Sequence, residues 1–265
     1  NRLRNKMIRP TTIPQTLQEL MVEHAVAREA LRLAFEHHKA LARGLRGIQR
    51  KRTISDIFEQ TMGEETHIKM MELNFLGGTG GLLSHAPRRA QSALMLIDGF
   101  QPEGVTKLAQ DSVFMMPHLG VLSTVHPKAA VEIFEKDCLV RLGTCIAPVG
   151  EGKSGETAVK IVIKMSEAEI TEDVPFGAIR RIPLKEKEAA NVKIEPHSSM
   201  DVGAGKGRSY TTSVEGGVVG IIVDARGRPL VLPEDTRNRS KELIEWFKAL
   251  DAYPQETLTK IQETL

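Results

Sequence analysis

The sequence is poor in the features that mark secreted, membrane and nucleic-acid-binding proteins. Two cysteines, Cys138 and Cys145, cannot build a disulfide framework, which favours a reducing, cytoplasmic compartment. The longest apolar runs are short, such as 218–223, whereas a membrane-spanning helix needs roughly 18 residues. Thirty-six basic and thirty-four acidic residues leave a net charge of +2, which gives no electrostatic case for binding nucleic acid or anionic lipid. We therefore expect neither nucleic acid nor a membrane as a partner.

Metal-binding and catalytic patterns are also missing. The eight histidines and two cysteines show no H-x-x-x-H, H-E-x-x-H or C-x-x-C spacing, so we predict no metal site. No G-x-S-x-G motif or acid–base constellation occurs, and we predict no catalytic residue. Gly150-Glu151-Gly152-Lys153-Ser154 ends like a phosphate-binding P-loop, but Ala147 stands where that motif needs its first glycine. A strand pattern follows it, so this segment is interpreted as a hairpin loop.

The pattern of apolar residues changes near residue 138. Before it, apolar residues recur every three or four positions, which predicts helices. After it, alternation and β-branching predict strands separated by glycine-rich or charged turns. One long helix is expected, with Thr16 as N-cap, an apolar stripe over residues 17–35, and Gly44 and Gly47 ending it. Further helices are expected over 57–62, 87–98, 114–123, 127–136 and 237–250, and the last stretch, 257–265, either adds a further turn or frays. The expected strands cover residues 70–76, 105–109, 140–147, 157–165, 168–174, 179–184, 191–196, 209–214 and 218–224.

This order of elements predicts an α/β plus β protein. Strand, helix and strand between residues 70 and 109 indicate an α/β layer with a parallel pair. The closely spaced later strands are typical of a small sandwich or barrel. We therefore predict an α/β lobe over residues 1–137, an all-β domain over 138–230 and a C-terminal helical segment over 231–265.

A glycine turn joins the first predicted strand to the following helix. Because glycine has no Cβ, the backbone of Gly77-Gly78-Thr79-Gly80-Gly81 can approach a ligand closely, and the helix offers free N–H groups. The spacing is not G-x-G-x-x-G, since Leu83 stands at the third glycine position. Nucleotide contact and a merely tight connection both stay open. Three polar residues follow the turn and either bind an anion or cap the next helix: Ser84, His85 and Arg88.

Several runs, in order, resemble one known family. They are 76–89 (LGGTGGLLSHAPRR), 100–106 (FQPEGVT), 111–120 (DSVFMMPHLG), 142–150 (LGTCIAPVG) and 216–229 (GGVVGIIVDARGRP). Together they look like the glutamate mutase accessory protein family called MutL, which is unrelated to the mismatch-repair protein of that name. The resemblance extends over roughly residues 20 to 250.

The resemblance implies a partial actin-like (ribonuclease H-like) lobe, akin to the reactivating chaperones of cobalamin-dependent enzymes. In such a fold Gly77, Gly78, Thr79, Gly80 and Gly81 match the turn that contacts the adenosine of ATP. Ser84, His85 and Arg88 are then the neighbouring candidates for nucleotide binding. The implied partners are the subunits of a cobalamin-dependent mutase such as glutamate mutase.

Two departures limit what the resemblance implies. The Asp-x-Gly-[Ser/Thr] turn that positions magnesium and phosphate has no match in order; Asp201-Val202-Gly203-Ala204 is similar but lies late in the chain. The Asp-x-His-x-x-Gly motif of cobalamin-binding proteins is absent, so any cobalamin belongs to the partner. We expect a C-terminal portion with half of a nucleotide cleft, inactive as an ATPase by itself, with magnesium bound in the complete protein. The alternative is a non-enzymatic interaction module without nucleotide binding, and the oligomeric state stays open.

Overall fold

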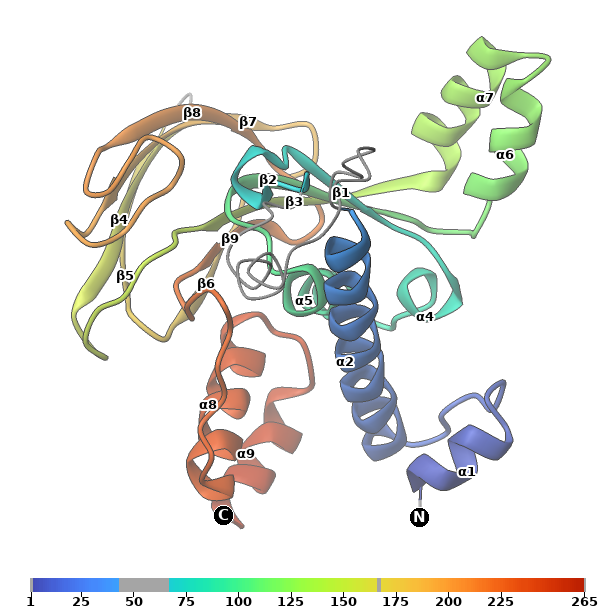
Figure 1. Cartoon of the computed structure of the whole chain (residues 1–265), viewed down its shortest axis with the longest axis horizontal. Coiled ribbons are helices and arrows are strands. Elements are labelled where there is room, and N and C mark those ends of the chain that lie inside the picture. The colour runs from blue at the N-terminus through green and yellow to red at the C-terminus, as the bar shows by residue number, and fades with distance from the viewer. Residues whose placement is uncertain (1, 43–66, 166–167, 265) are drawn as a thin grey trace, which may run out of the picture. The chain divides into compact units, whose positions relative to one another are not determined.

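The computed structural model describes residues 2–42, 67–165 and 168–264, which form two compact units, Asn1–Met70 and Met71–Leu265. The first unit contains helices α1 (Arg2–Ile8) and α2 (Leu17–Leu41) (Figure 1). The predicted capping box is confirmed: Thr16 Oγ1 accepts from the Glu19 N–H, and the Glu19 carboxylate accepts from the Thr16 N–H. The predicted end of the long helix at Gly44 and Gly47 lies outside the described residues. The short helix predicted at 57–62 also lies outside them.

The second unit contains two sheets and six α-helices among its described residues. The 3₁₀ turn η1 (Met70–Glu72) spans the boundary at which this unit begins, and the π-helical turn η2 (Phe134–Cys138) lies within it. Its strands are β1 (Phe75–Gly78), β2 (Gly104–Asp111), β3 (Leu139–Ala147), β4 (Thr157–Lys164), β5 (Glu169–Pro175), β6 (Ile179–Ile182), β7 (Ala189–Pro196), β8 (Tyr210–Glu215) and β9 (Gly220–Asp224). Its helices are α4 (Gly81–Ser84), α5 (Arg89–Phe100), α6 (Met116–Ser123), α7 (Pro127–Ile133), α8 (Thr236–Ala249) and α9 (Gln255–Glu263).

The five-stranded sheet has the order β1-β2-β3-β9-β6. The predicted parallel pair is confirmed, because β1 and β2 run parallel with Gly78 beside Gln110. Strands β3 and β9 are also parallel and approach very closely: a Cβ built at Gly143 would lie 1.8 Å from the Gly220 carbonyl oxygen. Glycine is therefore required at position 143, where φ is also +135°. Every residue of β9 is buried, as expected of a central strand with an unbroken apolar run.

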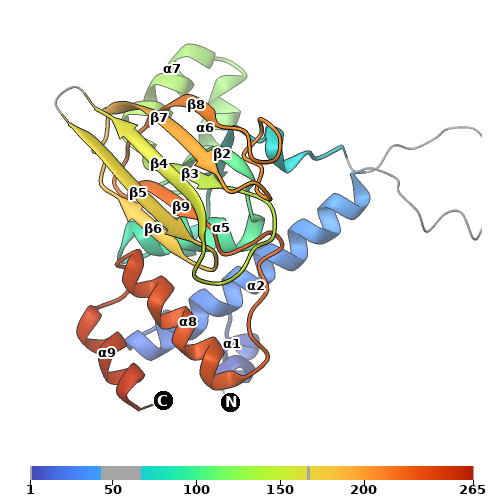
Figure 2. The same ribbon diagram turned by 90° about the vertical axis from the view of Figure 1, so that its left-hand side faces the viewer.

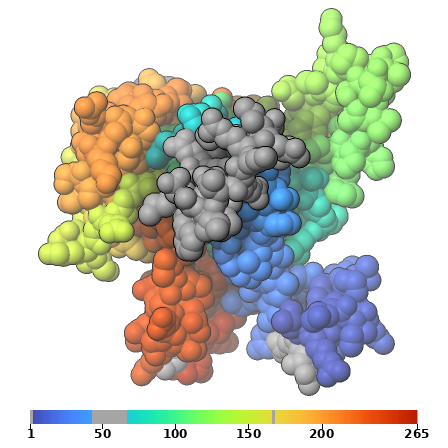
Figure 3. Space-filling view, viewed as in Figure 1, coloured from blue at the N-terminus to red at the C-terminus, as the bar shows by residue number. Residues whose placement is uncertain are grey.

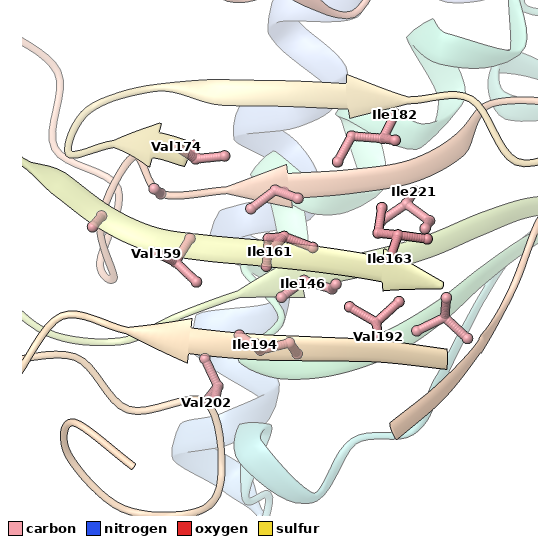
Figure 4. Close-up of a cluster of buried hydrophobic side chains, with 14 of the residues drawn as sticks. Ile146, Val159, Ile161, Ile163, Val174, Ile182, Val192, Ile194, Val202 and Ile221 are labelled. Atoms are coloured by element: carbon pink, nitrogen blue, oxygen red, sulfur yellow. The ribbon is translucent and has the colours of Figure 1, made fainter. Parts of the chain in front are cut away.

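The four-stranded sheet is antiparallel, with the order β5-β4-β7-β8, and it packs face to face on the first sheet (Figure 2). Its strands alternate, so one face is buried and the other carries polar residues of both signs. Ile161, Ile163 and Ile194 from this sheet meet Ile146 and Ile221 from the other in one apolar cluster (Figure 4). Burial of these branched side chains holds the two layers together.

The expected mixture of α/β and β structure is confirmed, and the assignment to an actin-like lobe stays a prediction. The seven strands predicted after residue 138 all form. However, β3, β6 and β9 belong to the same sheet as β1 and β2, so sheet pairing crosses the boundary predicted at 137/138. The loop at 150–154 is also not a hairpin, because β3 and β4, the strands that flank it, lie in different sheets. In the part of the chain that the structure describes, no helix is long and apolar enough to cross a membrane.

Candidate functional site

The glycine turn lies where β1 ends, at the carboxyl edge of the parallel pair. Its glycines serve different purposes. A Cβ at Gly78 would meet Leu83 Cδ1 at 2.8 Å and Leu96 Cδ2 at 3.0 Å, so Gly78 is needed for packing under α4 and α5. Gly80 has φ +108°, which L side chains rarely adopt, and a Cβ there or at Gly81 would meet nothing within 4 Å. The turn is therefore open at Gly80 and Gly81 and closely packed at Gly78.

Backbone donors are available at this open part of the turn. The first hydrogen bonds of α4 run from the Ser84 N–H to the Gly80 carbonyl and from the His85 N–H to the Gly81 carbonyl. The N–H groups of the three preceding residues, 81–83, thus come before the first closed helical turn and have no acceptor within the helix. An open turn with such donors favours contact with an anionic or polar ligand group.

Asp111, at the end of β2, holds the turn in place. Thr79 Oγ1 donates to its Oδ2 at 3.3 Å, the Met116 N–H donates to the same oxygen at 2.7 Å, and the Val113 N–H donates to Oδ1 at 3.2 Å. Asp111 is fully buried. Burial raises the pKa of its carboxyl group, but the backbone N–H bonds outweigh burial and hold that pKa below its usual range. Asp111 is therefore a buried, ionised anchor that joins the ends of both parallel strands.

The three polar residues after the turn have different surroundings. Ser84 is buried and its hydroxyl donates to the Asp111 carbonyl, so it supports the turn from within. His85 is exposed. The Arg88 guanidinium pairs with the Asp251 carboxylate at 2.6 Å and also donates to the Asp251 carbonyl at 3.0 Å, and the two side chains are 38% and 53% exposed. Such a surface pair contributes only about 0–1 kcal/mol, so an anionic ligand can compete for Arg88 at little cost.

A metal site does not emerge from the described side chains, which contain no cluster of three His, Cys, Asp or Glu residues that could hold an ion. The carboxylate of Asp111 is occupied by the donors named above. Asp201, in the sequence that resembles a phosphate-binding turn, accepts from the N–H groups of Gly203 and Gly205 at 2.7 and 2.9 Å. The Asp201 carboxylate therefore stabilises the loop of residues 201–205 through hydrogen bonds to its backbone.

A buried charge cluster, which the sequence analysis did not assign, lies at the end of β9. The Asp224 carboxylate accepts from Arg226 Nε at 2.8 Å and from Arg228 Nη2 at 2.8 Å, and Arg226 Nη2 reaches Asp98 Oδ1 at 2.8 Å. Burial raises the pKa of Asp224, but the two arginines outweigh burial and hold it far below its usual range. The spacing Asp-x-Arg-x-Arg directly after an apolar strand was the available signal. Because the cluster is paired internally, it ties β9 to α5.

Comparison with known proteins identifies the family. A family model described as MutL protein matches residues 1–138. The chain belongs to the MutL family. This is the glutamate mutase accessory family that the sequence resembles, and the match covers the glycine turn, Asp111 and helices α6 and α7. The runs at 142–150 and 216–229 lie beyond the matched region. No curated protein and no solved structure matches the chain.

Proposed function

We propose that this chain supplies the glycine-turn half of an ATP-binding cleft in an accessory protein of a cobalamin-dependent mutase such as glutamate mutase. The observation that carries the proposal is the open turn at Gly80 and Gly81, where bare backbone faces free space at the carboxyl edge of a parallel pair. Ligands of open α/β sheets bind at this edge. Membership of the MutL family supports the association with glutamate mutase.

The turn suits a nucleotide for physical reasons. Gly80 and Gly81 allow ribose or phosphate oxygens to approach the backbone, and the N–H groups of residues 81–83 supply donors. Asp111 fixes the turn through Thr79 before any ligand arrives, which lowers the entropic cost of binding. Exposed His85 and Arg88 lie further along the same segment and are the candidate side chains for the ligand. Gly77 is exposed beside the open part of the turn, whereas Gly78 and Ser84 are buried and support the turn from within.

The proposed role is coupling of nucleotide state to partner binding. In an actin-like protein, closure of two lobes around ATP shifts the population between arrangements that bind the partner differently. Such a shift would release damaged cobalamin from the mutase, as a reactivating chaperone does. Catalysis of ATP hydrolysis needs a group that holds magnesium and the terminal phosphate, and we expect the complete protein to supply it from outside these 265 residues.

The test is nucleotide-dependent thermal stability of the complete protein that contains this chain, as wild type and as Gly81→Val. A Cβ at Gly81 meets no atom within 4 Å besides those of its chain neighbours and its own helix backbone, so the position accepts a side chain without a clash at Cβ, and valine would occupy the space that the nucleotide would enter. ATP at about 100 times its Kd should stabilise the wild type by about 2.7 kcal/mol, which is measured as a rise in Tm. Gly81→Val should lose this shift. Gly78→Val is unsuitable, because its side chain would collide with Leu83 and Leu96.

Gly120→Val is the matched control, since a Cβ at Gly120 also meets nothing within 4 Å and its φ is ordinary. This control should keep the full ATP shift. A wild type that ATP and ADP leave unchanged would refute nucleotide binding and favour the alternative, an interaction module without nucleotide. Equal loss of the shift in both variants would show that the glycine turn is not the site.

A further inference from the structure

The side chain of Thr79 joins the outside of the glycine turn to its interior. Thr79 is exposed and lies next to the open position Gly80, so a ligand that contacts the turn can reach its hydroxyl. The same hydroxyl donates to the carboxylate of Asp111, which is fully buried. A threonine hydroxyl has one hydrogen to donate, so it serves either Asp111 or a ligand oxygen. Thr79 therefore has two alternative hydrogen-bonding arrangements.

The Thr79 bond is the longest of the hydrogen bonds described for this carboxylate. It measures 3.3 Å, beyond the usual range for a hydroxyl donor, whereas the Met116 N–H donates at 2.7 Å and the Val113 N–H at 3.2 Å. A phosphate oxygen carries negative charge as the carboxylate does, and it is free to approach an exposed hydroxyl at a shorter distance. Nucleotide binding therefore favours transfer of the Thr79 hydrogen bond from Asp111 to the ligand.

Asp111 also holds the base of the α6–α7 hairpin, defined here as residues 112–138. Its two backbone donors, Val113 and Met116, belong to this hairpin, and Met116 is the first residue of α6. The two ends of the hairpin are joined, because the N–H and the hydroxyl of Ser112 both donate to the Cys138 carbonyl at 2.8 Å. One carboxylate thus connects the glycine turn with the base of the hairpin.

The hairpin can loosen without disturbing the core of its unit. Helices α6 and α7 contact each other and η2, and no other described element contacts either of them extensively. Both extend away from the two sheets of their unit, as Figures 1 and 3 show. Helices of eight and seven residues are marginal alone, and elements with few packing contacts open at a low free energy. The bonds to Asp111 at the base therefore matter for the stability of the hairpin.

We propose that Thr79 couples nucleotide binding to the α6–α7 hairpin. A nucleotide oxygen that accepts from the Thr79 hydroxyl takes one donor away from Asp111. A buried, ionised carboxylate with fewer donors is less stable, so opening of the hairpin base, which lets water reach Asp111, becomes easier. The base of the hairpin is therefore looser in the nucleotide-bound protein than in the free protein. This inference rests on the proposed nucleotide site and names the element that responds to it.

Hydrogen exchange followed by mass spectrometry tests the coupling in the complete protein that contains this chain. In the wild type, the non-hydrolysable ATP analogue AMPPNP should speed backbone exchange of residues 113–116 about 10-fold, as expected for loss of one hydrogen bond to a charged group. Thr79→Val removes the donor and should show the same acceleration without nucleotide, so this comparison does not depend on binding. Thr79→Ser keeps the hydroxyl and should behave like the wild type.

Thr211→Val is the matched control, because Thr211 is also exposed but lies in β8, and it should exchange like the wild type. The Tm of the same samples separates this inference from the proposed function. If AMPPNP leaves the Tm of the wild type unchanged, both are overturned. A Tm shift with unchanged or slower exchange at 113–116 would overturn the coupling alone. So would wild-type exchange in nucleotide-free Thr79→Val, or an acceleration that Thr211→Val shares.

Discussion

Replacing Asp224 with asparagine should destabilise the second unit strongly. The carboxylate accepts from the Arg226 N–H at 3.2 Å, from Arg226 Nε at 2.8 Å and Nη2 at 2.9 Å, and from Arg228 Nη2 at 2.8 Å. Asparagine keeps one acceptor oxygen, but it turns an NH₂ group towards arginine donors and leaves Asp98 as the one carboxylate that this cluster sets against two guanidinium groups. Breaking a buried ion pair in this way costs about 3–5 kcal/mol, which lowers the folded-to-unfolded ratio by two to three and a half orders of magnitude.

Urea denaturation followed by tryptophan fluorescence measures this loss. The chain has one tryptophan, Trp246, whose ring lies 4.9 Å from the Arg226 guanidinium carbon, so the signal reports the unit that contains the cluster. Asp251→Asn is the control, since it breaks the exposed pair with Arg88 and should cost about 0–1 kcal/mol. If Asp224→Asn costs no more than Asp251→Asn, the cluster does not stabilise the fold as argued.

The dependence of stability on pH gives the same interaction a second test. The two arginines hold the pKa of Asp224 far below its usual range in the folded state. The stabilisation is therefore complete above the unfolded pKa, about 3.9, and is lost as pH falls below it. The wild type should lose its advantage over Asp224→Asn as pH falls from about 5 to 2. An advantage that stays constant over this range would contradict the reasoning.

Three further predictions concern a buried amide, the thiols and catalysis. The side-chain amide of Gln110 is buried, and its nitrogen and oxygen have no hydrogen-bond partner among the described residues. Gln110→Met should therefore raise the free energy of unfolding, measured by urea denaturation, by about 1–3 kcal/mol. A loss of stability would contradict this reasoning. Burial raises the pKa of the Cys145 thiol to about 12, and it also raises the pKa of the buried Cys138 thiol. Iodoacetamide at pH 8 should therefore modify neither thiol in the native chain and both thiols in urea, which the mass of the intact chain would show. The isolated chain should show no magnesium-dependent ATP turnover in a phosphate-release assay, and turnover would reveal a catalytic carboxylate that we have not identified.

Local elements of this protein follow directly from its residues. Thr16 and Glu19 predict the start of α2, and alternation of β-branched residues predicts β4 and β7, because hydrogen bonds and side-chain periodicity within one segment decide both. The glycine turn is predicted for the same reason: a left-handed φ at Gly80 is a local demand on the backbone.

The candidate site is only partly visible in the sequence. The turn from Gly77 to Gly81 was identified, but Asp111, which anchors it, lies 32 residues beyond Thr79. Arg88 is predicted either to bind an anion or to cap the next helix, and in the structure it is the N-cap residue of α5, with its backbone N–H donating to Gln91 Oε1. Its guanidinium pairs with Asp251, 163 residues away, and that contact is not predicted. Local patterns carry no information about which distant residue arrives beside a given side chain.

The amino-acid sequence alone therefore determined the start of α2, the seven strands after residue 138 and the glycine turn, since each depends on interactions between near neighbours in the chain. The strand predicted at 70–76 is wrong over its first part, where Met70–Glu72 form a 3₁₀ turn and β1 begins only at Phe75. Only the tertiary structure decided that β3, β6 and β9 join the sheet of β1 and β2, and that Asp98, Asp224 and Arg226 form one buried cluster. Strand pairing and charge burial depend on contacts between segments far apart in the chain, and an apolar strand such as β9 satisfies the same local rules in either sheet.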